Sequence, residues 1–461
     1  MAKTRAKETG RPASTGVIPG RYALSVGNPG TEPPTGWSWV RLTDVARLET
    51  GHTPSRRHPE YWGGDIPWVA SGDATEHRGE TLLDTKEHTN DAGIANSSAR
   101  ILPEHTVCLC RTASVGHVVV LGRPMATSQD FVNWVCSDDI DWRFLRAVLL
   151  AERDSFLRFA TGTTHQTIYF PEVKAFHACL PPRREQAAIG GLIQDLDDKI
   201  DVNRRISETL EEIARALFTS WFVDFDPVRG TSTVPEDIRR LFPDRLVDST
   251  IGPVPEGWQV APLGEHVEVT RGLSYTGAGL ADEGMPLHNL NSIREGGGYK
   301  EDGIKHYVGE YRDRDRVRPG DVIVANTDLT QNARVIGSPA IIPRSFGDDG
   351  LYSHHIYRVH ALDGSPLTRR WLYLLLVVPR MHQQVAGYSN GTTVNMLPKD
   401  GLTRPLIAAP PPELVEHFES IIAPMFEQQE TLTAESKTLA ALRDTLLPKL
   451  ISGELRLKEA S

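Results

Sequence analysis

Residues 183–222 read RREQAAIGGLIQDLDDKIDVNRRISETLEEIARALFTSWF. Apolar residues recur in this stretch at steps of mostly three and four, which is the spacing of a coiled-coil seam. They are Ile189, Ile193, Leu196, Ile200, Ile206, Leu210, Ile213, Leu217 and Trp221. Asn203 lies on the same seam, where a single polar residue can fix the register between two helices. We therefore predict a long central helix over residues 181–226.

The end of the chain carries a second stretch with the same spacing. Its apolar residues are Phe418, Ile422, Met425, Leu432, Leu439, Leu442, Leu446 and Leu450, with Gln429 and Ser436 at polar seam positions. Pro424 lies inside this stretch, and we expect an irregularity there because proline has no amide hydrogen to donate. A helix of about forty residues is roughly 60 Å long. We predict a C-terminal helix and tail over residues 412–461, paired with the central helix as an antiparallel coiled coil.

The sequence outside the two helices repeats itself once. PTGWSWVRLTDVARLETG (34–51) aligns without a gap with PEGWQVAPLGEHVEVTRG (255–272). Three further landmarks follow in the same order in both copies: a strand pattern after a proline turn (101–110 and 317–326), a Gly-Thr-Thr sequence (161–173 and 390–402) and the prolines that open each long helix (180–186 and 409–415). Matched landmarks at a nearly constant offset of about 220 residues indicate a duplicated domain rather than a solenoid.

Each copy of the repeat begins with a globular segment of mixed character. Short apolar runs between glycines and prolines predict strands, and longer runs with helical spacing predict helices. The predicted fold class is mixed α/β (α+β), with two tandem globular domains separated by the two long helices. We expect these domains at residues 34–180 and 255–411, with a flexible tail over 1–33 and a linker over 227–254. They would lie at opposite ends of the coiled coil, related by a pseudo-twofold axis.

The composition narrows the possible classes of protein. With 60 acidic and 50 basic residues the formal net charge is −10, whereas a free-standing DNA-binding protein is usually basic. This balance counts against a protein that grips DNA alone, but it is compatible with one that binds DNA inside a larger assembly. The four cysteines form no CxxC pair, which argues against a zinc site. The basic N-terminus lacks the apolar core of a signal peptide and no run could span a membrane, so we expect a cytoplasmic protein.

The chain resembles the specificity subunits of type I restriction-modification enzymes. The resemblance rests on the loop TPSRRHPEYWGGDIPWVASGD (53–73), on the Gly-Thr-Thr and Leu-Pro-Pro sequences before the helix, and on the ending LLPKLISGELRL (446–457). It covers about residues 34–457, and the combination is specific although each piece alone is weak. It implies that each globule is a target-recognition domain that reads one half of a split double-stranded DNA sequence.

The resemblance also implies partners. The helices would set the gap between the half-sites and would dock two methyltransferase subunits, which methylate adenine N6 and carry the S-adenosylmethionine site. Two restriction subunits that use ATP and Mg²⁺ are a further possible partner. Independently of the resemblance, two similar heads on a rod suit two half-sites about one helical turn, roughly 34–36 Å, apart. Because the two heads differ in sequence, we expect the half-sites to differ too.

Motifs for catalysis by the chain itself are missing. An adenine-N6 methyltransferase needs an (N/D)PP(Y/F) motif for the flipped base, and the nearest match, Asp226-Pro227-Val228, does not fit it. The sequence has no phosphate-binding GxxxxGK(S/T) loop. The two histidines of Ser-His-His (353–355) would point to opposite faces of a strand, which does not favour a metal site. We therefore predict a chain without catalytic residues, metal or cofactor of its own.

Candidate DNA-binding residues of the first globule follow predicted strands. Arginine is the usual bidentate partner of guanine, and hydroxyl groups contact phosphates or base edges. The candidates are Arg56, Arg57, Ser71, Asp73, Arg111, Thr112 and Ser114. The alternative for each is a solvated surface turn, and for Tyr61 and Trp62 core packing is favoured over base stacking.

The second globule carries a different set of candidates. After the strand that corresponds to 101–110 comes an amide-rich loop, and Asn and Gln pair well with adenine. The candidates there and beside it are Arg271, Asn326, Thr327, Gln331, Asn332 and Arg334. The Gly-Thr-Thr sequences recur in both globules, so we expect them to hold phosphate or to shape the domain rather than to read bases. Their candidates are Thr163, Thr164, Gln166, Thr392, Thr393 and Asn395.

Two other functions stay open at this point. A coiled-coil scaffold that never touches DNA would explain the acidic net charge but not the duplicated, loop-rich heads. A fused DNA-modifying enzyme would need the missing methyltransferase motifs. The target sequence does not follow from the residues, because DNA recognition also depends on DNA shape.

Overall fold

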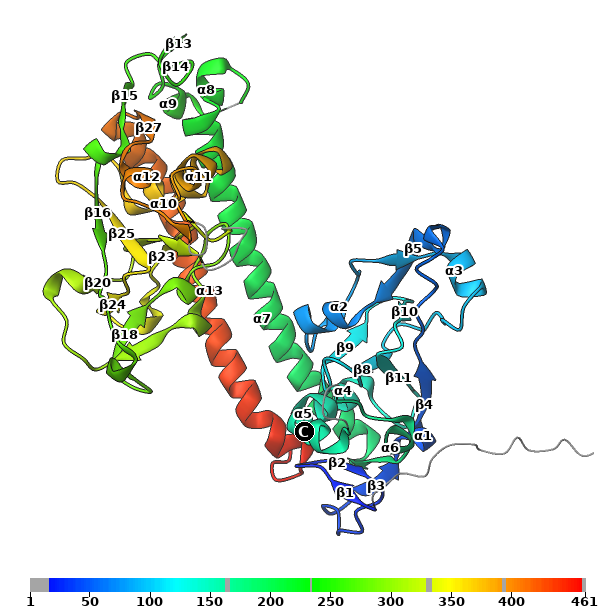
Figure 1. Cartoon of the computed structure of the whole chain (residues 1–461). Coiled ribbons are helices and arrows are strands. Elements are labelled where there is room, and N and C mark those ends of the chain that lie inside the picture. Colours follow the sequence, from blue (N-terminus) through cyan, green and yellow to red (C-terminus); the bar gives the residue numbers. More distant parts are fainter. Residues whose placement is uncertain (1–15, 162–165, 233, 329–333, 392–394, 458–461) are drawn as a thin grey trace, which may run out of the picture. The chain divides into compact units, whose positions relative to one another are not determined.

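The structure is a computed structural model that describes residues 16–161, 166–232, 234–328, 334–391 and 395–457. The chain divides into two compact units, one made of residues 1–202 and 436–461 and the other of residues 203–435. The unit boundaries fall inside the two long helices α7 (Arg183–Phe218) and α13 (Pro412–Ile451). Each long helix therefore contributes one part to each unit (Figure 1).

The helices α7 and α13 run antiparallel in both units. In the first unit, Arg443 donates from Nη1 to Asp197 Oδ1 at 2.7 Å. In the second unit, the buried Asn203 donates from Nδ2 to Glu435 Oε2 at 2.9 Å. Residue numbers thus rise along α7 while those of their partners fall along α13, which confirms the antiparallel coiled coil.

The burial along α7 corrects part of the predicted seam. Ile206 and Ile213, which were expected on the seam, are 41% and 42% exposed. Ala214 and Phe218 are buried in their place. The reason is that a straight helix has 3.6 residues per turn, so its contact face drifts away from a strict 3.5-residue seam.

The expected irregularity at Pro424 is absent. The helix α13 runs without a break from Pro412 to Ile451. Pro424 is exposed, so the carbonyl group one turn earlier, which loses its amide partner, can bind water instead. A second seam prediction on this helix is wrong, because Leu442 is 46% exposed.

The first head contains a five-stranded sheet. Its order is β4-β11-β8-β9-β6, with β11 antiparallel to both β4 and β8. The strands are β4 (Ala46–Thr50), β11 (Phe131–Cys136), β8 (Val107–Cys110), β9 (Val118–Leu121) and β6 (Thr81–Leu82). The helices α4 (Trp142–Ala151) and α5 (Arg153–Phe159) bury their apolar faces in the same core.

The second head repeats four of the five strands of this sheet. Its order is β16-β25-β21-β23, and β25 is again antiparallel to both neighbours. The strands are β16 (Val267–Arg271), β25 (Ile356–Ala361), β21 (Val322–Ala325) and β23 (Pro339–Ile341). The helices α10 (Arg369–Val377) and α11 (Pro379–Ala386) correspond to α4 and α5. The predicted mixed α/β fold and the duplication are therefore confirmed.

A second sheet in each head contains a parallel strand pair that also recurs. In the first head β5 (Trp62–Val69) is parallel to β10 (Ala126–Thr127). In the second head β18 (Met285–His288) is parallel to β24 (Gly350–Tyr352). In both heads the short parallel strand leads through a tight turn into the second strand of the main sheet, β11 or β25.

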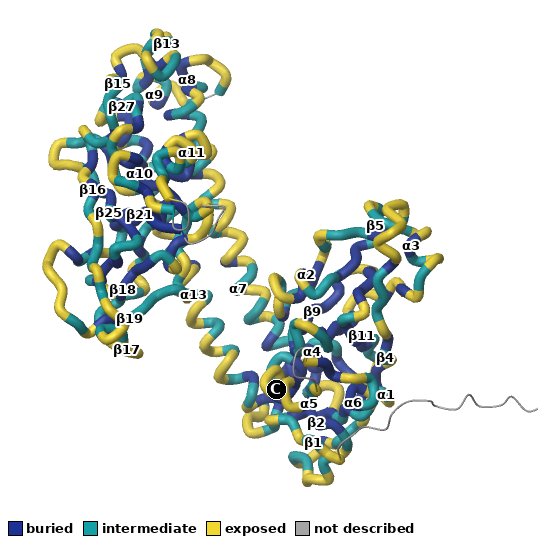
Figure 2. Tube along the Cα trace, in the orientation of Figure 1, coloured by how far each residue is buried: buried dark blue, intermediate teal, exposed yellow. Residues whose placement is uncertain are grey.

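The long helices supply part of the core of each unit. In the first unit, Ile189 and Ile193 of α7 and Leu450 and Ile451 of α13 are buried in the cluster around Trp134. In the second unit the cluster is aromatic, and the rings of Phe218 and Phe418 lie 6.0 Å apart with Trp371 5.3 Å from Phe218. The buried segments run along the helices and sheets of each unit (Figure 2).

The predicted tail over residues 1–33 is wrong in its second half. Residues 18–26 form β1 (Ile18–Pro19) and β2 (Leu24–Val26), and β2 pairs with β12 (Phe176–Leu180). The buried Glu152 carboxylate holds this segment by accepting hydrogen bonds from the backbone amides of residues 21–24 at 2.6–3.2 Å. A segment of three strand residues tied by a remote carboxylate gives no periodic signal in the sequence.

The predicted linker over residues 227–254 is also structured. It contains α8 (Asp226–Arg229), α9 (Glu236–Arg239) and the strand β13 (Leu246–Val247), which pairs with β14 (Val254–Pro255). Val228, Ile238 and Phe242 are buried in the core of the second unit. No helix of the described residues is long and apolar enough to cross a membrane.

We predict that Leu450→Ala destabilises the first unit. Leu450 is fully buried in the core of that unit, and loss of a buried leucine costs about 2–5 kcal/mol. Urea unfolding of the full chain measures the change. Leu442→Ala is the matched control on the same helix, since this leucine is largely exposed and its loss should cost less than about 0.5 kcal/mol. Equal effects of both substitutions would contradict the assigned burial.

We also predict a pH dependence of the second unit. Burial lowers the pKa of His288 from 6.5 to about 4, so below pH 6.5 the unfolded chain binds a proton that the folded chain refuses. Stability should fall as the pH drops from 6.5 to 4, by up to about 3 kcal/mol. His288→Asn should flatten this dependence, measured by thermal unfolding at several pH values. An unchanged profile in the variant would assign the acid sensitivity to other groups.

Candidate nucleic-acid interface

Three loops of the first head meet where β8 ends. Arg111 follows β8 directly, and its amide donates to the carbonyl of Asp130 at 2.7 Å while its carbonyl accepts from the amide of Ile168 at 3.0 Å. Its guanidinium donates from Nη2 to the carbonyl of Gln129 at 3.1 Å and lies 4.8 Å from the centre of the Phe170 ring. Arg111 thereby joins the turn before β11 to the segment after the Gly-Thr-Thr sequence.

The second head makes the same set of hydrogen bonds around a different side chain, and we call this set the frame. Asn326 follows β21, and its amide donates to the carbonyl of His355 at 3.1 Å while its carbonyl accepts from the amide of Leu397 at 2.8 Å. Its side-chain amide donates from Nδ2 to the carbonyl of His354 at 3.1 Å. Each of these three hydrogen bonds has its counterpart at Arg111, so Arg111 and Asn326 are equivalent positions, one residue away from the pairing of Cys110 with Asn326 in the aligned stretches 101–110 and 317–326.

The turn that accepts these hydrogen bonds is also equivalent in the two heads. It is Ser128-Gln129-Asp130 in the first head and Ser353-His354-His355 in the second. The serine amide donates to the carbonyl of Val69 in one head and of His288 in the other, at 2.9 Å in both. Each turn is therefore fixed at both ends by main-chain hydrogen bonds.

A glycine at the end of each repeat landmark makes room for this turn. A Cβ atom added to Gly51 would lie 1.9 Å from the carbonyl oxygen of Ser128, and one added to Gly272 would lie 2.6 Å from that of Ser353. Real carbon atoms do not approach so closely, so only glycine fits these positions. The final glycine of the aligned stretches 34–51 and 255–272 is thus required in both copies for the same steric reason.

The loop over residues 53–73 holds one arginine firmly. Arg56 donates from Nη2 to Glu87 Oε2 at 2.7 Å, and its guanidinium lies 3.8 Å from the centre of the Trp62 ring. The hydrogen bond with Glu87 raises the pKa of Arg56 and lowers that of the Glu87 carboxyl. Trp62 in turn packs edge-on against the buried Trp68. Trp62 thus has the packing role that the sequence favours.

The neighbouring candidates of this loop differ from Arg56. Arg57 is exposed, and its side chain makes no hydrogen bond or ion pair with any described residue. Asp73 is buried and accepts from the amides of Ala70 at 2.8 Å and Lys86 at 3.3 Å. These bonds give the Asp73 carboxylate a structural task at the start of the helix α2 (Ser71–Glu76). Ser71 begins that helix and is half-buried.

The other candidates of the first head lie beside Arg111. Thr112 forms an antiparallel bridge with Thr167, with their hydroxyl oxygens 3.2 Å apart. The Ser114 hydroxyl lies 3.0 Å from that of Thr75. Gln166 is exposed next to the bridge, whereas Thr163 and Thr164 lie outside the described residues.

The candidates of the second head form a similar group. Thr327 and Asp328 pair with Met396 and Asn395 as the short strands β22 (Thr327–Asp328) and β26 (Asn395–Met396). The exposed Arg271 donates from Nε to the carbonyl of His354 at 2.9 Å. Arg334 is also exposed and lies 3.8 Å from Glu295. Gln331, Asn332, Thr392 and Thr393 lie outside the described residues.

Several residues of this edge are missed by the sequence analysis. The Gln129 amide contacts the hydroxyl of Thr53, and the Lys305 ammonium donates to the hydroxyl of Tyr275 at 3.1 Å. The histidines of Ser-His-His lie in a turn and not in a strand, and their rings are 3.9 Å apart. Burial and the neighbouring positive charges lower the pKa of His355. The available signal in the sequence was the repeat itself, because each turn lies between two matched landmarks, 101–110 and 161–173 in the first copy and 317–326 and 390–402 in the second.

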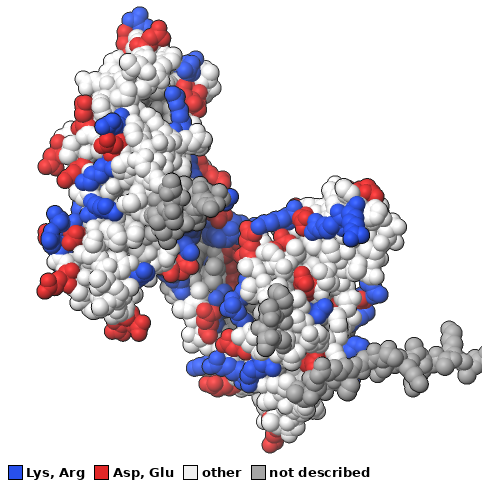
Figure 3. Space-filling model, in the orientation of Figure 1, with Lys and Arg blue, Asp and Glu red and all other residues white. Residues whose placement is uncertain are grey.

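Charge alone does not mark the interface. Basic and acidic side chains are interspersed over the face seen in Figure 3. Among the described residues no three His, Cys, Asp or Glu side chains are grouped so that they could hold a metal ion.

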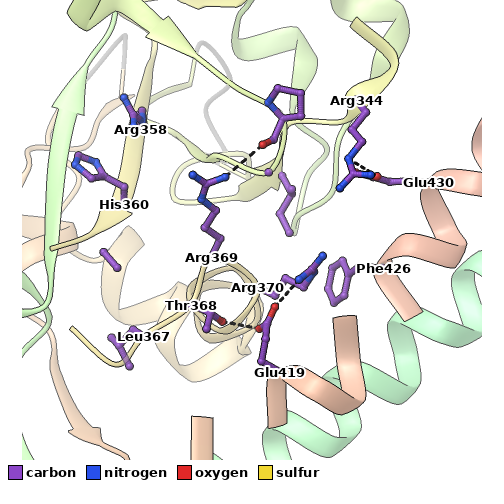
Figure 4. Close-up of a pocket in the computed structure, with 14 residues that line it drawn as sticks. Arg344, Arg358, His360, Leu367, Thr368, Arg369, Arg370, Glu419, Phe426 and Glu430 are labelled. Atoms are coloured by element: carbon purple, nitrogen blue, oxygen red, sulfur yellow. Dashed lines mark hydrogen bonds and ion pairs between the residues drawn. The ribbon is translucent and has the colours of Figure 1, made fainter. Parts of the chain in front are cut away.

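A pocket of about 520 Å³ in the second unit is lined by four arginines, but these are paired (Figure 4). The pairs are Arg370 with Glu419, Arg344 with Glu430 at 3.3 Å, and both Arg358 and Arg369 with Asp321 at 3.3 and 3.5 Å. The pocket also lies beyond the middle of β25, away from the turn that precedes this strand. We therefore do not assign it to the interface.

The fold and the two matched edges define a duplicated domain that carries different side chains on one frame. Residues 34–212 match the family model of the type I restriction modification DNA specificity domain. The chain is similar to the specificity subunits of type I restriction-modification enzymes.

Similar proteins span most of the chain. The type I restriction enzyme MjaIX specificity subunit of Methanocaldococcus jannaschii is 25% identical over 432 residues, which cover 92% of this chain and 95% of that protein. The HindI specificity subunit of Haemophilus influenzae is 27% identical over 64% of this chain and 72% of its own length. The crystal structure of an S subunit from M. genitalium has the same fold, with a TM-score of 0.56, 14% identity and coverage of 92% of this chain and 97% of that one.

We predict that Gly51→Ala destabilises the first unit, because the added methyl group would collide with the turn at Ser128. Overpacking of this kind costs about 1–3 kcal/mol. Gly191→Ala is the control, since a Cβ at that helix position meets no atom within 4 Å and alanine favours a helix over glycine. Urea unfolding of both variants tests the assignment, which fails if Gly51→Ala leaves the unfolding midpoint unchanged.

Proposed function

We infer that this chain is the sequence-specific DNA-binding subunit of a type I restriction-modification complex. Each head reads one half of a bipartite, asymmetric target. The observation that carries this function is the matched frame. Two heads share the hydrogen bonds that place one edge, made by Arg111 in one head and by the buried Asn326 in the other, and yet they present Gln129 on one edge and His354 on the other. A shared frame with different side chains is what reading two different half-sites requires.

The chemistry of these side chains suits base recognition. Arginine binds the O6 and N7 atoms of guanine through two hydrogen bonds, and Asn or Gln binds N6 and N7 of adenine. Each such pair is worth about 1–3 kcal/mol of discrimination against the wrong base. The Gly-Thr-Thr sequences, which both heads share, are suited to phosphates, because contacts to the DNA backbone carry no sequence information.

The long helices are the proposed docking site for two methyltransferase subunits. The helix α7 exposes Val202, Ile206 and Ile213, and α13 exposes Leu442. Exposed apolar side chains at helical spacing are typical of a protein interface. Up to two restriction subunits complete the proposed complex. In this proposal the chain works in the cytoplasm and has no catalytic residues of its own.

The cofactors of the complex belong to the partners in this proposal. The methyltransferase subunits carry S-adenosylmethionine for methylation of adenine N6, and a restriction subunit uses ATP and Mg²⁺. The acidic net charge of −10 also fits a subunit that binds DNA together with partners. DNA affinity depends strongly on basic residues that neutralise the phosphate charges, and partners can supply such residues.

Methylome sequencing of a host that expresses this chain with its methyltransferase partner tests the function. We expect N6-methyladenine in both halves of one split, asymmetric motif. A host with the methyltransferase alone is the control and should show no such motif. A stable complex that leaves the DNA unmethylated, and that binds random and genomic DNA equally, would favour a scaffold without DNA recognition.

A further inference from the structure

The two turns before β11 and β25 carry different side chains on a common frame. In the first head the carbonyl groups of Gln129 and Asp130 accept hydrogen bonds from Arg111. In the second head those of His354 and His355 accept them from Asn326. The frame thus uses the backbone of the turn, so the identity of the turn side chains can change without loss of these hydrogen bonds.

The side chains of the turns have few structural tasks. Gln129 is exposed, and its side-chain contact is with the Thr53 hydroxyl. The Asp130 carboxylate accepts one long hydrogen bond, of 3.3 Å, from the neighbouring Ser128 hydroxyl. The ring nitrogens of His354 and His355 have contacts of 3.4 and 3.3 Å. All four side chains are at least partly accessible.

The two turns present opposite chemistry. The first offers an amide and a carboxylate, which suit adenine and the amino group of cytosine. The second offers two imidazole rings next to the exposed Arg271, whose guanidinium is tied to the carbonyl of His354. Nitrogen donors of this kind suit the acceptor-rich edge of guanine. A difference in net charge between the turns would also alter the electrostatic preference of each head.

We propose that the turn residues Gln129 and Asp130 in the first head and His354 and His355 in the second are specificity-determining residues. Arg111 and Asn326 act as positioning residues that hold each turn in place. The inference rests on the proposed DNA-reading function, and it names the side chains that distinguish one half-site from the other.

Exchange of the turns tests the proposal. The double variants Gln129→His with Asp130→His, and His354→Gln with His355→Asp, are expressed separately as full chains with the methyltransferase partner, and the methylated motif is sequenced. Each variant should change or relax only the half-site of its own head, with methylation of the original half-site reduced about ten- to hundred-fold. The half-site of the untouched head should stay the same.

Controls separate this proposal from the function on which it rests. Arg123→Gln alters an exposed residue in another turn of the first head and should leave both half-sites unchanged. If the double variants fully retain the wild-type split motif, the turn proposal is overturned while the function stands. If the wild-type complex itself recognises no split motif, the proposed function fails.

Single variants keep the test decisive if a double variant does not assemble with the methyltransferase. Gln129→His and His354→Gln each change one side chain and leave the backbone hydrogen bonds in place. Measured binding of the wild-type half-site and of single-base variants of it should show altered base preference at one or two positions. An unchanged preference at every position, with normal affinity, would overturn the proposal.

Discussion

The antiparallel pairing of α7 with α13 is the constraint on which both heads depend. It brings Arg443, near the end of the chain, to Asp197, and Asn203 to Glu435. The apolar residues next to these pairs do not pack only against each other. They enter the cores of the two units, so that each head is built partly from a helix that also belongs to the other unit.

The two heads also differ in their exposed side chains while they keep the same backbone structure at the edge. The edges are held by hydrogen bonds that end on main-chain carbonyl groups, and by a glycine whose place no side chain can take. Arg111 and Asn326 each donate a side-chain hydrogen bond to the equivalent carbonyl group of their turn, although they differ in size and charge. A backbone acceptor tolerates different donors, and this tolerance allows two copies of one domain to diverge in their exposed chemistry.

Much of the architecture was predictable from the sequence, because the spacing of apolar residues and the internal repeat can both be read from it directly. The spacing of apolar residues predicts the helices, and the aligned landmarks predict two equal domains, although they place Asn326 opposite Cys110 rather than Arg111. The exposure of Ile206 and Ile213 was not predictable, because a small drift in helix phase decides it. The strand at residues 24–26 was also missed, since it depends on the remote carboxylate of Glu152.

The candidate site was predictable only in part, for a related reason. Arg56 and Arg111 were predicted because both lie in loops that follow strands. Residue type alone does not show that the Arg56 guanidinium stacks on Trp62. Asp73 has the right type for a contact, and yet its carboxylate caps a helix. Gln129 and His354 give no motif at all, because their position is set by hydrogen bonds to their own carbonyl groups from residues far along the chain.

The core of the first head has a consequence for folding during synthesis. Leu450 and Ile451 belong to that core, but the ribosome adds them after the whole of the second unit. The second unit, in contrast, is one continuous segment over residues 203–435, which leaves the ribosome earlier. The head that is made first is therefore the last to finish folding. A chain whose translation stops before Leu450 therefore contains at most one complete head.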